Sequence, residues 1–472
     1  MQGRDIGSPG HQRAAEWVAA RFKAAGLKPA GDNGTWFQSF PVHDVRVDSA
    51  RAAVVRKGGR LPLRFLWDFS VRAADDLPAR IDAPMVFAGY CRAQDLTGAR
   101  GRIAVCINTR RAGLTSGAER LKNAQAAGAV GLIQVDDPGF TIEPFRWPQA
   151  YARTVTLAET PPAPTHGFVA MTLSARAFAA MARGSGHDGA KVLADGGAKR
   201  PLPVFDLPGR FTARFTTSRR DERGVNVLAA LPGSDPKLAG QTLVLGAHLD
   251  GYGFGTPVKG DNLYNGTLDD AAYVGTLIRF AERRAGRPMR RTVVFAAFDG
   301  EEKGLLGSTW FTRHPTVPKA SLAADINLDQ LRPLFPLKLL TVLALDDTTL
   351  GDTVRQVAAA RGIAVQPDPE PERALLRRAD HWPFMKIGVP ATGFIFGFRP
   401  GTDAERRYRE WYRVRYHRPQ DDLTQPMDFK AAGDFNRFFY QLAESVADAP
   451  QAPAWKPGSP YAPKRTDPSS EP

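Results

Sequence analysis

The feature that most constrains the fold is an apolar run at residues 292–298, Thr-Val-Val-Phe-Ala-Ala-Phe. A run of this kind is typical of a central strand in a parallel sheet, because such strands are buried on both faces. Between this run and the apolar run at residues 242–246, apolar residues recur at helical spacing. The alternation predicts an α/β fold with a doubly wound, mostly parallel sheet. Further strands of this sheet are expected at residues 242–246, 321–328, 337–345 and 389–396.

A different pattern occupies residues 51–205, where short strand-like runs alternate with turns rich in glycine and proline. One helix-like stretch, residues 118–129, lies among them. We therefore expect a smaller mixed β/α domain at 51–205, inserted into a larger domain made of residues 1–50 and 206–448. Residues 449–472 are rich in proline and polar residues without apolar periodicity, so we expect a disordered or draped tail.

The overall charge is basic, with 63 lysines and arginines against 49 acidic residues and a net charge of +14. The basic residues occur in short scattered runs rather than in a stripe with aromatic residues, which argues against a nucleic-acid partner. No stretch approaches the ~18 uninterrupted apolar residues of a membrane span. The two cysteines, Cys91 and Cys106, are compatible with one disulfide or with two buried thiols.

Histidine and acidic residues stand where the predicted strands end or where a helix begins. Because the carboxyl ends of parallel strands meet at one edge of a sheet, segments that are distant in sequence can converge there. The candidates are His248 and Asp250 after the first strand, Asp269 before the helix, Glu301 and Glu302 after residues 292–298, Asp329 after the next strand, and His417 in a loop.

These side chains fit zinc, which binds imidazole nitrogen and carboxylate oxygen and keeps one position open for water in catalytic sites. Two zinc ions about 3.5–4 Å apart need a bridging ligand. A carboxylate can bridge, because each of its oxygens can face one ion. Two further ligands per ion then make five, and two histidines with three carboxylates are available: His248, Asp269, Glu302, Asp329 and His417.

Each of these residues also has an ordinary structural explanation when it is taken alone. An aspartate before a helix, such as Asp269, is usually a cap. A Glu-Glu pair is usually solvated, and a histidine beside arginines, such as His417, usually lies on the surface. The joint pattern carries the prediction, because the successive ligand intervals of 21, 33, 27 and 88 residues all end at predicted strand ends or loops.

The same segments resemble metallopeptidase family 28, the two-zinc aminopeptidases. The matching motifs occur in the family's order: GAHLDG, DNLYNGTLDDAAYVG, FDGEEKGLLGS, INLDQ and YHRPQDD. The segment IGSPGHQRAAEWVAARFKAAGL resembles the family's opening helix, and the middle segment resembles the protease-associated domain often inserted in these enzymes. The resemblance spans residues 3–447. It implies a zinc-exopeptidase fold, two Zn²⁺ ions, a peptide substrate and aminopeptidase activity.

The resemblance also implies a role for each ligand. By position, Asp269 would bridge the two ions, His248 and Asp329 would complete one ion, and Glu302 and His417 would complete the other. A cis peptide bond would follow the bridging aspartate.

Two further acidic residues receive catalytic roles from the resemblance. Glu301 would be the general base that takes the proton from the attacking water. Asp250 would orient the imidazole ring of His248.

Two positions depart from the family pattern. Tyr273 replaces the usual glycine, so we expect a change in local packing. The usual Ser-Asp-His is here Ala379-Asp380-His381. We expect Asp380 and His381 near the substrate and assign them no metal.

Several alternatives are compatible with parts of the pattern. A carboxypeptidase would need a cationic clamp for the terminal carboxylate, for which Arg378 is a candidate. A glutaminyl-cyclase-like acyl transferase would use one zinc ion, and an inactive binding relative would lack a ligand or the base. A related family carries a dimerisation domain between the fourth ligand and the last histidine, where this chain has only 88 residues. The complete ligand set with Glu301 favours a hydrolase.

Localisation is expected from the resemblance, since family members are often exported to the periplasm or secreted. No signal peptide is visible before the first helical pattern, so the protein is cytoplasmic or the given start lies downstream of a leader. The sequence carries no signal for the oligomeric state.

Overall fold

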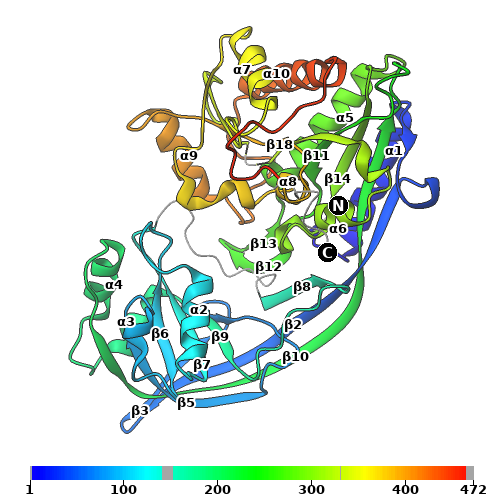
Figure 1. The fold of residues 1–472 in the computed structure, drawn as a ribbon. Helices are drawn as coiled ribbons and strands as arrows, with labels where there is room; N and C mark the ends of the chain where they lie inside the picture. Colours follow the sequence, from blue (N-terminus) through cyan, green and yellow to red (C-terminus); the bar gives the residue numbers. More distant parts are fainter. Residues whose placement is uncertain (1–2, 141–151, 330, 464–472) are drawn as a thin grey trace, which may run out of the picture. The chain divides into compact units, whose positions relative to one another are not determined.

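The computed structural model describes residues 3–140, 152–329 and 331–463 (Figure 1). These residues group into two compact units. The first unit comprises Met1–Pro41, Arg223–Gly253 and Leu263–Pro472, and the second comprises Val42–Glu222 and Phe254–Asn262.

The expected domain boundaries at 50/51 and 205/206 both fall inside long strands, β2 (Phe37–Arg56) and β10 (Val204–Leu231). The units instead change at residues 41/42 and 222/223. A strand that continues from one unit into the next leaves no break in the residue pattern, so the sequence does not mark the change. The identity of the inserted segment as a protease-associated domain stays a prediction.

The first unit is built on a sheet whose strands follow the order β18-β15-β11-β14-β10. Residues 227–231 of β10 pair antiparallel with β14. The other pairs are parallel, which confirms the mostly parallel sheet predicted from the apolar runs (Figure 1). The parallel strands are β11 (Thr242–His248), β14 (Thr292–Phe298), β15 (Leu322–Asn327) and β18 (Ala391–Thr392).

Helices cover both faces of this sheet. Phe295 of β14 packs with Phe22 of α1 (Pro9–Ala24) and with α5 (Ala272–Arg284). Phe298 points the other way and packs with α6 (Leu306–Arg313) and α8 (His381–Lys386). Burying each such aromatic side chain contributes about 1.5–3 kcal/mol to folding. The alternation of faces along β14 makes the sheet doubly wound.

The apolar run at residues 337–345 does not join this sheet. Its strand β16 (Leu339–Val342) pairs with β17 (Ala364–Gln366) and β19 (Phe394–Phe396) in a separate three-stranded sheet. The prediction that this run extends the main sheet is therefore wrong. An apolar run indicates a buried strand, but it does not specify the neighbouring strand.

Three more helices complete the first unit: α7 (Leu350–Ala359), α9 (Asp403–Val414) and α10 (Phe429–Asp448). Phe438 of α10 packs edge-on against Phe394 of β19 at 5.5 Å between ring centres. In the described part of the chain, none of the helices combines the length and the apolar character that a membrane crossing requires.

The second unit is a mixed β/α structure. Its parallel strands are β5 (Arg80–Ala88), β6 (Ile103–Asn108), β7 (Gly131–Asp136) and β9 (Val169–Leu173). Antiparallel pairs add β3 (Gly59–Arg64), β4 (Phe69–Val71) and β8 (Arg153–Leu157). Its helices are α2 (Gly117–Ala126), α3 (Ala175–Ala182) and α4 (Gly189–Gly197).

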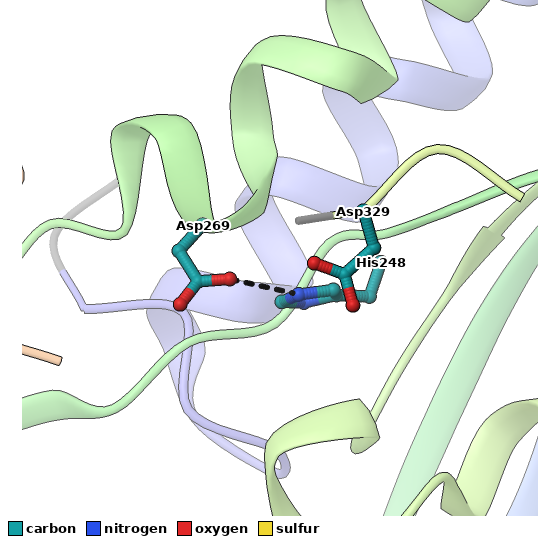
Figure 2. A group of neighbouring side chains, drawn as sticks. All are labelled: His248, Asp269 and Asp329. Carbon is teal, nitrogen blue, oxygen red and sulfur yellow. Dashed lines mark ion pairs between the residues drawn. The ribbon is translucent and has the colours of Figure 1, made fainter. Parts of the chain in front are cut away.

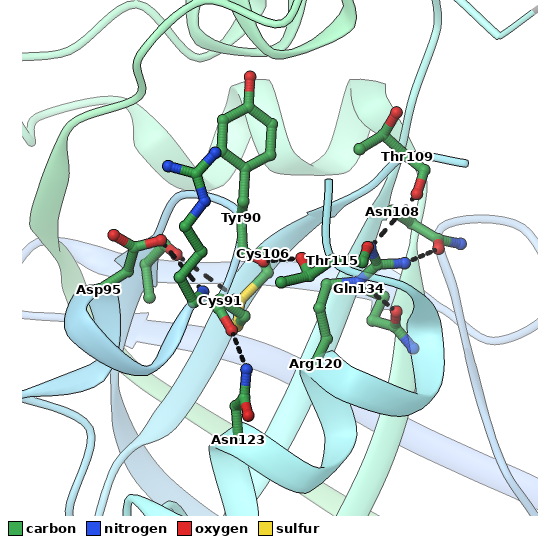
Figure 3. Close-up of a disulfide and its surroundings, with 12 residues drawn as sticks. Tyr90, Cys91, Asp95, Cys106, Asn108, Thr109, Thr115, Arg120, Asn123 and Gln134 are labelled. Carbon is green, nitrogen blue, oxygen red and sulfur yellow. Dashed lines mark hydrogen bonds between the residues drawn. A yellow bond between two sulfur atoms is a disulfide. The ribbon is translucent and has the colours of Figure 1, made fainter. Parts of the chain in front are cut away.

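A disulfide between Cys91 and Cys106 lies inside the second unit (Figure 3). Cys106 belongs to β6, Cys91 follows β5, and their Cα atoms are 5.8 Å apart. Asn123 of α2 donates a hydrogen bond to the carbonyl of Cys91 at 3.0 Å. Of the two states left open by the sequence, the structure has the paired one, with both cysteines buried.

The first part of the tail packs on the first unit, so the expected disorder does not apply to residues 449–463. The indole N–H of Trp455 donates to the carbonyl of Gly388 at 2.7 Å, and Thr349 N donates to the carbonyl of Ala454 at 2.8 Å. Tryptophan anchors a chain without regular structure, because it combines a large apolar area with one donor. Residues 464–472 lie outside the described residues.

Candidate metal centre

The candidate ligands stand at the carboxyl edge of the first unit's sheet. His248 is the last residue of β11, and Asp329 follows β15 by two residues. Turns supply the others: Glu301 and Glu302 after β14, Asp269 in Thr267–Ala271 before α5, and His417 after α9.

The five candidate ligands come together in the structure. Their donor atoms form groups within 4.8 Å, among them His248 with Asp269 and Asp329, and Asp269 with Glu302 and His417. Figure 2 shows the first group, in which the side chains of its members point toward one another. Asp269 belongs to both groups.

The two carboxylate oxygens of Asp269 face different histidines. Oδ1 lies 3.6 Å from Nε2 of His248, whereas Oδ2 lies 3.3 Å from Nε2 of His417. Glu302 Oε2 lies 3.1 Å from the same nitrogen of His417. A carboxylate with one oxygen directed at each of two donor groups has the geometry that a bridge between two metal ions requires.

Several donor atoms of this cluster are buried and make no hydrogen bond. They include both ring nitrogens of His248 and Oδ2 of Asp269. An unsatisfied buried polar group costs about 1–3 kcal/mol, so grouping such atoms is unfavourable unless a cation binds them. Imidazole nitrogen with carboxylate oxygen is the donor set of zinc.

Asp250 connects His248 with the turn that carries the glutamates. Its Oδ1 lies 3.4 Å from Nδ1 of His248, the ring nitrogen that faces away from Asp269. Its carboxylate also accepts hydrogen bonds from the backbone N–H groups of Glu301 at 3.1 Å and Glu302 at 3.2 Å. This position suits an orienting residue, which stays a prediction.

Glu301 lies beside the cluster, with Oε2 3.9 Å from Nε2 of His248. Burial raises the pKa of Glu301 well above its ordinary value; His248 offsets part of this rise, and Asp329 and Glu302 add to it. A raised pKa suits a carboxyl group that accepts and then releases a proton.

A cavity of about 430 Å³ adjoins the cluster and is lined in part by Asp269, Glu301, Glu302 and His417. Its volume lies within the ~300–1,000 Å³ typical of small-molecule sites. Residue Tyr252 adds an aromatic wall beside His417, at 4.5 Å between ring centres.

Asp380 and His381, which are expected near the substrate, are both buried and are not among the residues that line the cavity. Asp380 accepts a hydrogen bond from the hydroxyl of Ser308. Nε2 of His381 lies 2.8 Å from the carbonyl of Leu376. Asp380 is close enough to Glu301 to add to the rise of its pKa, and a place of both residues near the substrate stays a prediction.

The comparisons with known proteins agree with this site. Residues 226–443 match the model of peptidase family M28. The matched segment contains all five candidate ligands. A protein from Pyrenophora teres f. teres (strain 0-1) named "Probable zinc metalloprotease" is 28% identical over 245 residues, which are 48% of this chain and 49% of the relative. The chain thus spans about half the length of this curated relative.

Solved structures show the same fold as this chain. An aminopeptidase from Aneurinibacillus sp. strain AM-1 superposes with a TM-score of 0.62, covering 95% of this chain and 91% of that one at 17% identity. A zinc aminopeptidase from Bacillus subtilis gives a TM-score of 0.63, covering 95% and 92% at 18% identity. At these identities the likeness establishes the fold.

Two features around Asp269 correspond to the motif of the resembled family and to its departure in this chain. The peptide bond between Asp269 and Asp270 is cis, as the resemblance implies. Asp270 accepts a hydrogen bond from the backbone N–H of His248 at 3.0 Å. Tyr273, in place of the usual glycine, donates its hydroxyl to the carbonyl of Leu331 at 2.8 Å and so ties α5 to the segment after Asp329.

Two residues that sequence reasoning missed hold Asp269 in place. Arg332 is fully buried, with Nη2 3.4 Å from Asp269 Oδ1 and Nη1 donating to the carbonyl of Leu268 at 2.9 Å. Asp421 accepts from the backbone N–H groups of Leu268 at 2.9 Å and Asp269 at 3.1 Å. Asp421 lies in the motif of His417, which was the available signal, whereas Arg332 lies in no motif.

Arg4 is a third missed residue. Its buried guanidinium donates to the carbonyls of Leu249 and Asn265 at 2.6 Å and of Gly266 at 2.8 Å. These carbonyls flank two candidate ligands, since Leu249 follows His248 and Gly266 stands three residues before Asp269. Arg4 therefore fixes the spacing of the two segments that carry them.

We expect Arg4→Gln to weaken zinc binding by about 10- to 100-fold, the typical cost of losing support behind a metal ligand. Glutamine cannot span three carbonyls, so the two ligand segments lose their common anchor. Competition with a zinc-binding dye measures the affinity, and thermal unfolding of the same sample reports the fold. Arg13→Gln removes an equal charge from an exposed position of α1 and is the control. Equal zinc affinity in both variants would show that Arg4 does not position the site.

Proposed function

We propose that this protein is a two-zinc exopeptidase that releases residues from the amino end of peptides. The observation that carries the proposal is the placement of the Asp269 oxygens, one toward His248 and one toward His417. In the proposal Asp269 bridges the ions, His248 and Asp329 hold one, and Glu302 and His417 hold the other. The match of residues 226–443 to the model of peptidase family M28 supports this assignment.

Two zinc ions at this site would polarise the scissile carbonyl and lower the pKa of water. The protein's own contribution begins with Glu301, which would take the proton of the attacking water and deliver it to the leaving amine. Asp250 would keep the turn of Glu301 in place through two backbone N–H groups, and would hold the ring of His248. Exclusion of bulk water by the cavity walls would strengthen these interactions.

The choice of the amino end is supported by the two solved structures of the same fold, both of which are aminopeptidases. A carboxypeptidase on the same site is the second candidate. The observation in its favour is that Arg377 and Arg378 line the cavity, because guanidinium groups bind carboxylates in a bidentate manner.

Paired peptides distinguish the two. We expect hydrolysis to stop when the amino terminus is acetylated and to continue when the carboxyl terminus is amidated. Mass spectrometry of the products identifies which residue leaves, and metal analysis of the same sample counts the zinc. Cleavage that survives acetylation and stops on amidation would reverse the assignment of the ends while leaving the metal site unchanged.

We also propose that the enzyme acts outside the reducing cytosol. The buried pair Cys91–Cys106 supports this, because disulfides persist in oxidising compartments and are rare in cytosolic proteins. Alkylation of the native protein from its source under non-reducing conditions tests it. Quantitative labelling of both cysteines after denaturation without reductant would contradict the proposal.

A further inference from the structure

The cavity beside the candidate metal centre has two chemically different walls. One wall carries the carboxylates and the imidazole already described. The other carries three basic side chains and one indole: Arg377, Arg378, Lys386 and Trp382. Among the described residues that line the cavity, the only acidic ones are Asp269, Glu301 and Glu302.

The basic wall is attached to the metal-site loop. Nη2 of Arg378 donates to the hydroxyl of Tyr416 at 3.2 Å, and the Tyr416 ring stacks on His417 at 3.6 Å between ring centres. This contact places a guanidinium one side chain away from a candidate ligand. Arg378 is therefore close enough to meet a substrate group near the scissile bond.

The other two cations lie on either side of Trp382 of α8, since Arg377 precedes this helix and Lys386 ends it. The guanidinium of Arg377 lies 5.3 Å from the ring centre of Trp382, so it is braced by a cation–π contact. Lys386 stands at the end of the same helix, and burial together with the nearby Arg313 lowers the pKa of its ammonium group. A partly buried cation that lies beside another cation is stabilised when an anion binds next to both.

The net charge of the chain cannot account for this arrangement by itself. With 63 lysines and arginines, exposed cations are common on this protein. Several surface cations of the first unit stand beside a carboxylate on the same helix, as Lys430 does with Asp434 at 2.9 Å. Among the described residues that line the cavity, the only carboxylates that face the basic wall are those of the candidate metal centre.

We propose that the basic wall of Arg377, Arg378 and Lys386 binds a carboxylate of the substrate, so that the enzyme prefers peptides with an acidic group next to the cleaved bond. This inference rests on the proposed function. The carboxylate has two possible sources with the same chemistry. One is the side chain of an amino-terminal aspartate or glutamate, and the other is the terminal carboxylate of a short peptide.

The test compares four substrates of the zinc-loaded enzyme: Glu-Ala, Gln-Ala and the carboxyl amide of each. Glutamine has the shape of glutamate without its charge, so the Glu/Gln ratio of kcat/KM isolates the carboxylate. Hydrogen bonds to a charged group are worth about 1.5–3 kcal/mol, so we expect a ratio of roughly 10 to 100 between the two amides. A preference confined to the free acids, which disappears on amidation, would assign the basic wall to the terminal carboxylate instead.

Variants connect the preference to the basic wall. In Arg377→Gln combined with Lys386→Gln, the preference for a carboxylate should fall toward one. Lys430→Gln on α10 loses an equal kind of charge far from the cavity lining and should keep the wild-type preference. Calorimetric titration with glutarate gives a readout without turnover, and we expect roughly tenfold weaker binding in the double variant only.

The outcomes separate the inference from the function beneath it. Hydrolysis of all four peptides without a carboxylate preference would overturn the inference and leave the exopeptidase proposal intact. An unchanged preference in the double variant would also overturn it, because two of the three cations of the basic wall would then take no part in binding the carboxylate. Failure of the zinc-loaded enzyme to cleave any peptide would overturn the proposed function, and the inference with it.

Discussion

Glu301→Gln is expected to lower kcat by about 10²- to 10⁴-fold while both zinc ions remain bound. Glutamine keeps the size of glutamate and can accept a hydrogen bond, but it cannot take a proton from water and deliver it to the leaving amine. The backbone of residue 301 would still be held by Asp250. Single-turnover kinetics on a cleaved peptide measures the loss, and metal analysis verifies the occupancy.

The neighbouring residue supplies a matched control for this change. Glu302→Gln alters the same functional group one position along the same turn, but its Oε2 lies 3.1 Å from the candidate ligand His417. We expect this variant to lose zinc affinity first and activity as a consequence, so that excess zinc restores part of its rate. If Glu301→Gln loses zinc, or if both variants turn over at nearly the wild-type rate, the two roles are assigned wrongly.

Chelation is expected to remove two zinc ions per chain and to abolish peptide hydrolysis, with recovery when zinc is returned. We expect the chelated protein to remain folded, because Arg332 offers a buried positive charge 3.4 Å from Oδ1 of Asp269 when the ions are gone. Its guanidinium also stacks on Trp411, 4.3 Å from the ring centre, which fixes its place.

Three measurements on one sample check this expectation: metal content, peptide hydrolysis and circular dichroism. Recovery within the mixing time would agree with a preformed site, whereas a slow phase with a change in helical signal would indicate refolding. An active protein that contains one zinc ion per chain would contradict the two-metal mechanism.

The parts of the site that the sequence predicts are those tied to strand ends. His248 and Asp329 follow buried strands whose apolar runs are plain in the sequence, and the topology of a parallel sheet does the rest. The assignment of Asp269 as a ligand was less secure, because an aspartate before a helix usually caps that helix. The conjunction of five segments, rather than any one of them, made the metal centre predictable.

The parts that sequence reasoning missed depend on contacts between distant segments. Arg4 donates to carbonyls that lie 245 to 262 residues away in the sequence. In a chain with many arginines, nothing in the sequence distinguishes Arg4 from the others. Arg332 lies in no motif, yet it is fully buried beside Asp269. Residue type gives no sign of burial when a long charged side chain finds its partners in the backbone.

Strand assignment shows the same limit. Residues 337–345 are as apolar as the central strands, but β16 lies in the separate small sheet. The tail shows the opposite case. Its composition predicts a solvent-exposed segment, whereas Trp455 anchors it to the carbonyl of Gly388. In both cases the pattern indicates how buried a segment is on average, and the partner is decided by the rest of the fold.

The packing of α1 has a consequence for how the protein is made. Phe22 rests on Phe295, which the ribosome adds 273 residues later. At roughly 5–20 residues per second, the first helix waits roughly 14 to 55 seconds for that partner. The segment between them contains residues 42–222 of the second unit, which are complete during the wait. We therefore expect the second unit to fold first on a nascent chain, while α1 keeps its apolar face exposed and depends on chaperones or on its amphipathic character to stay soluble.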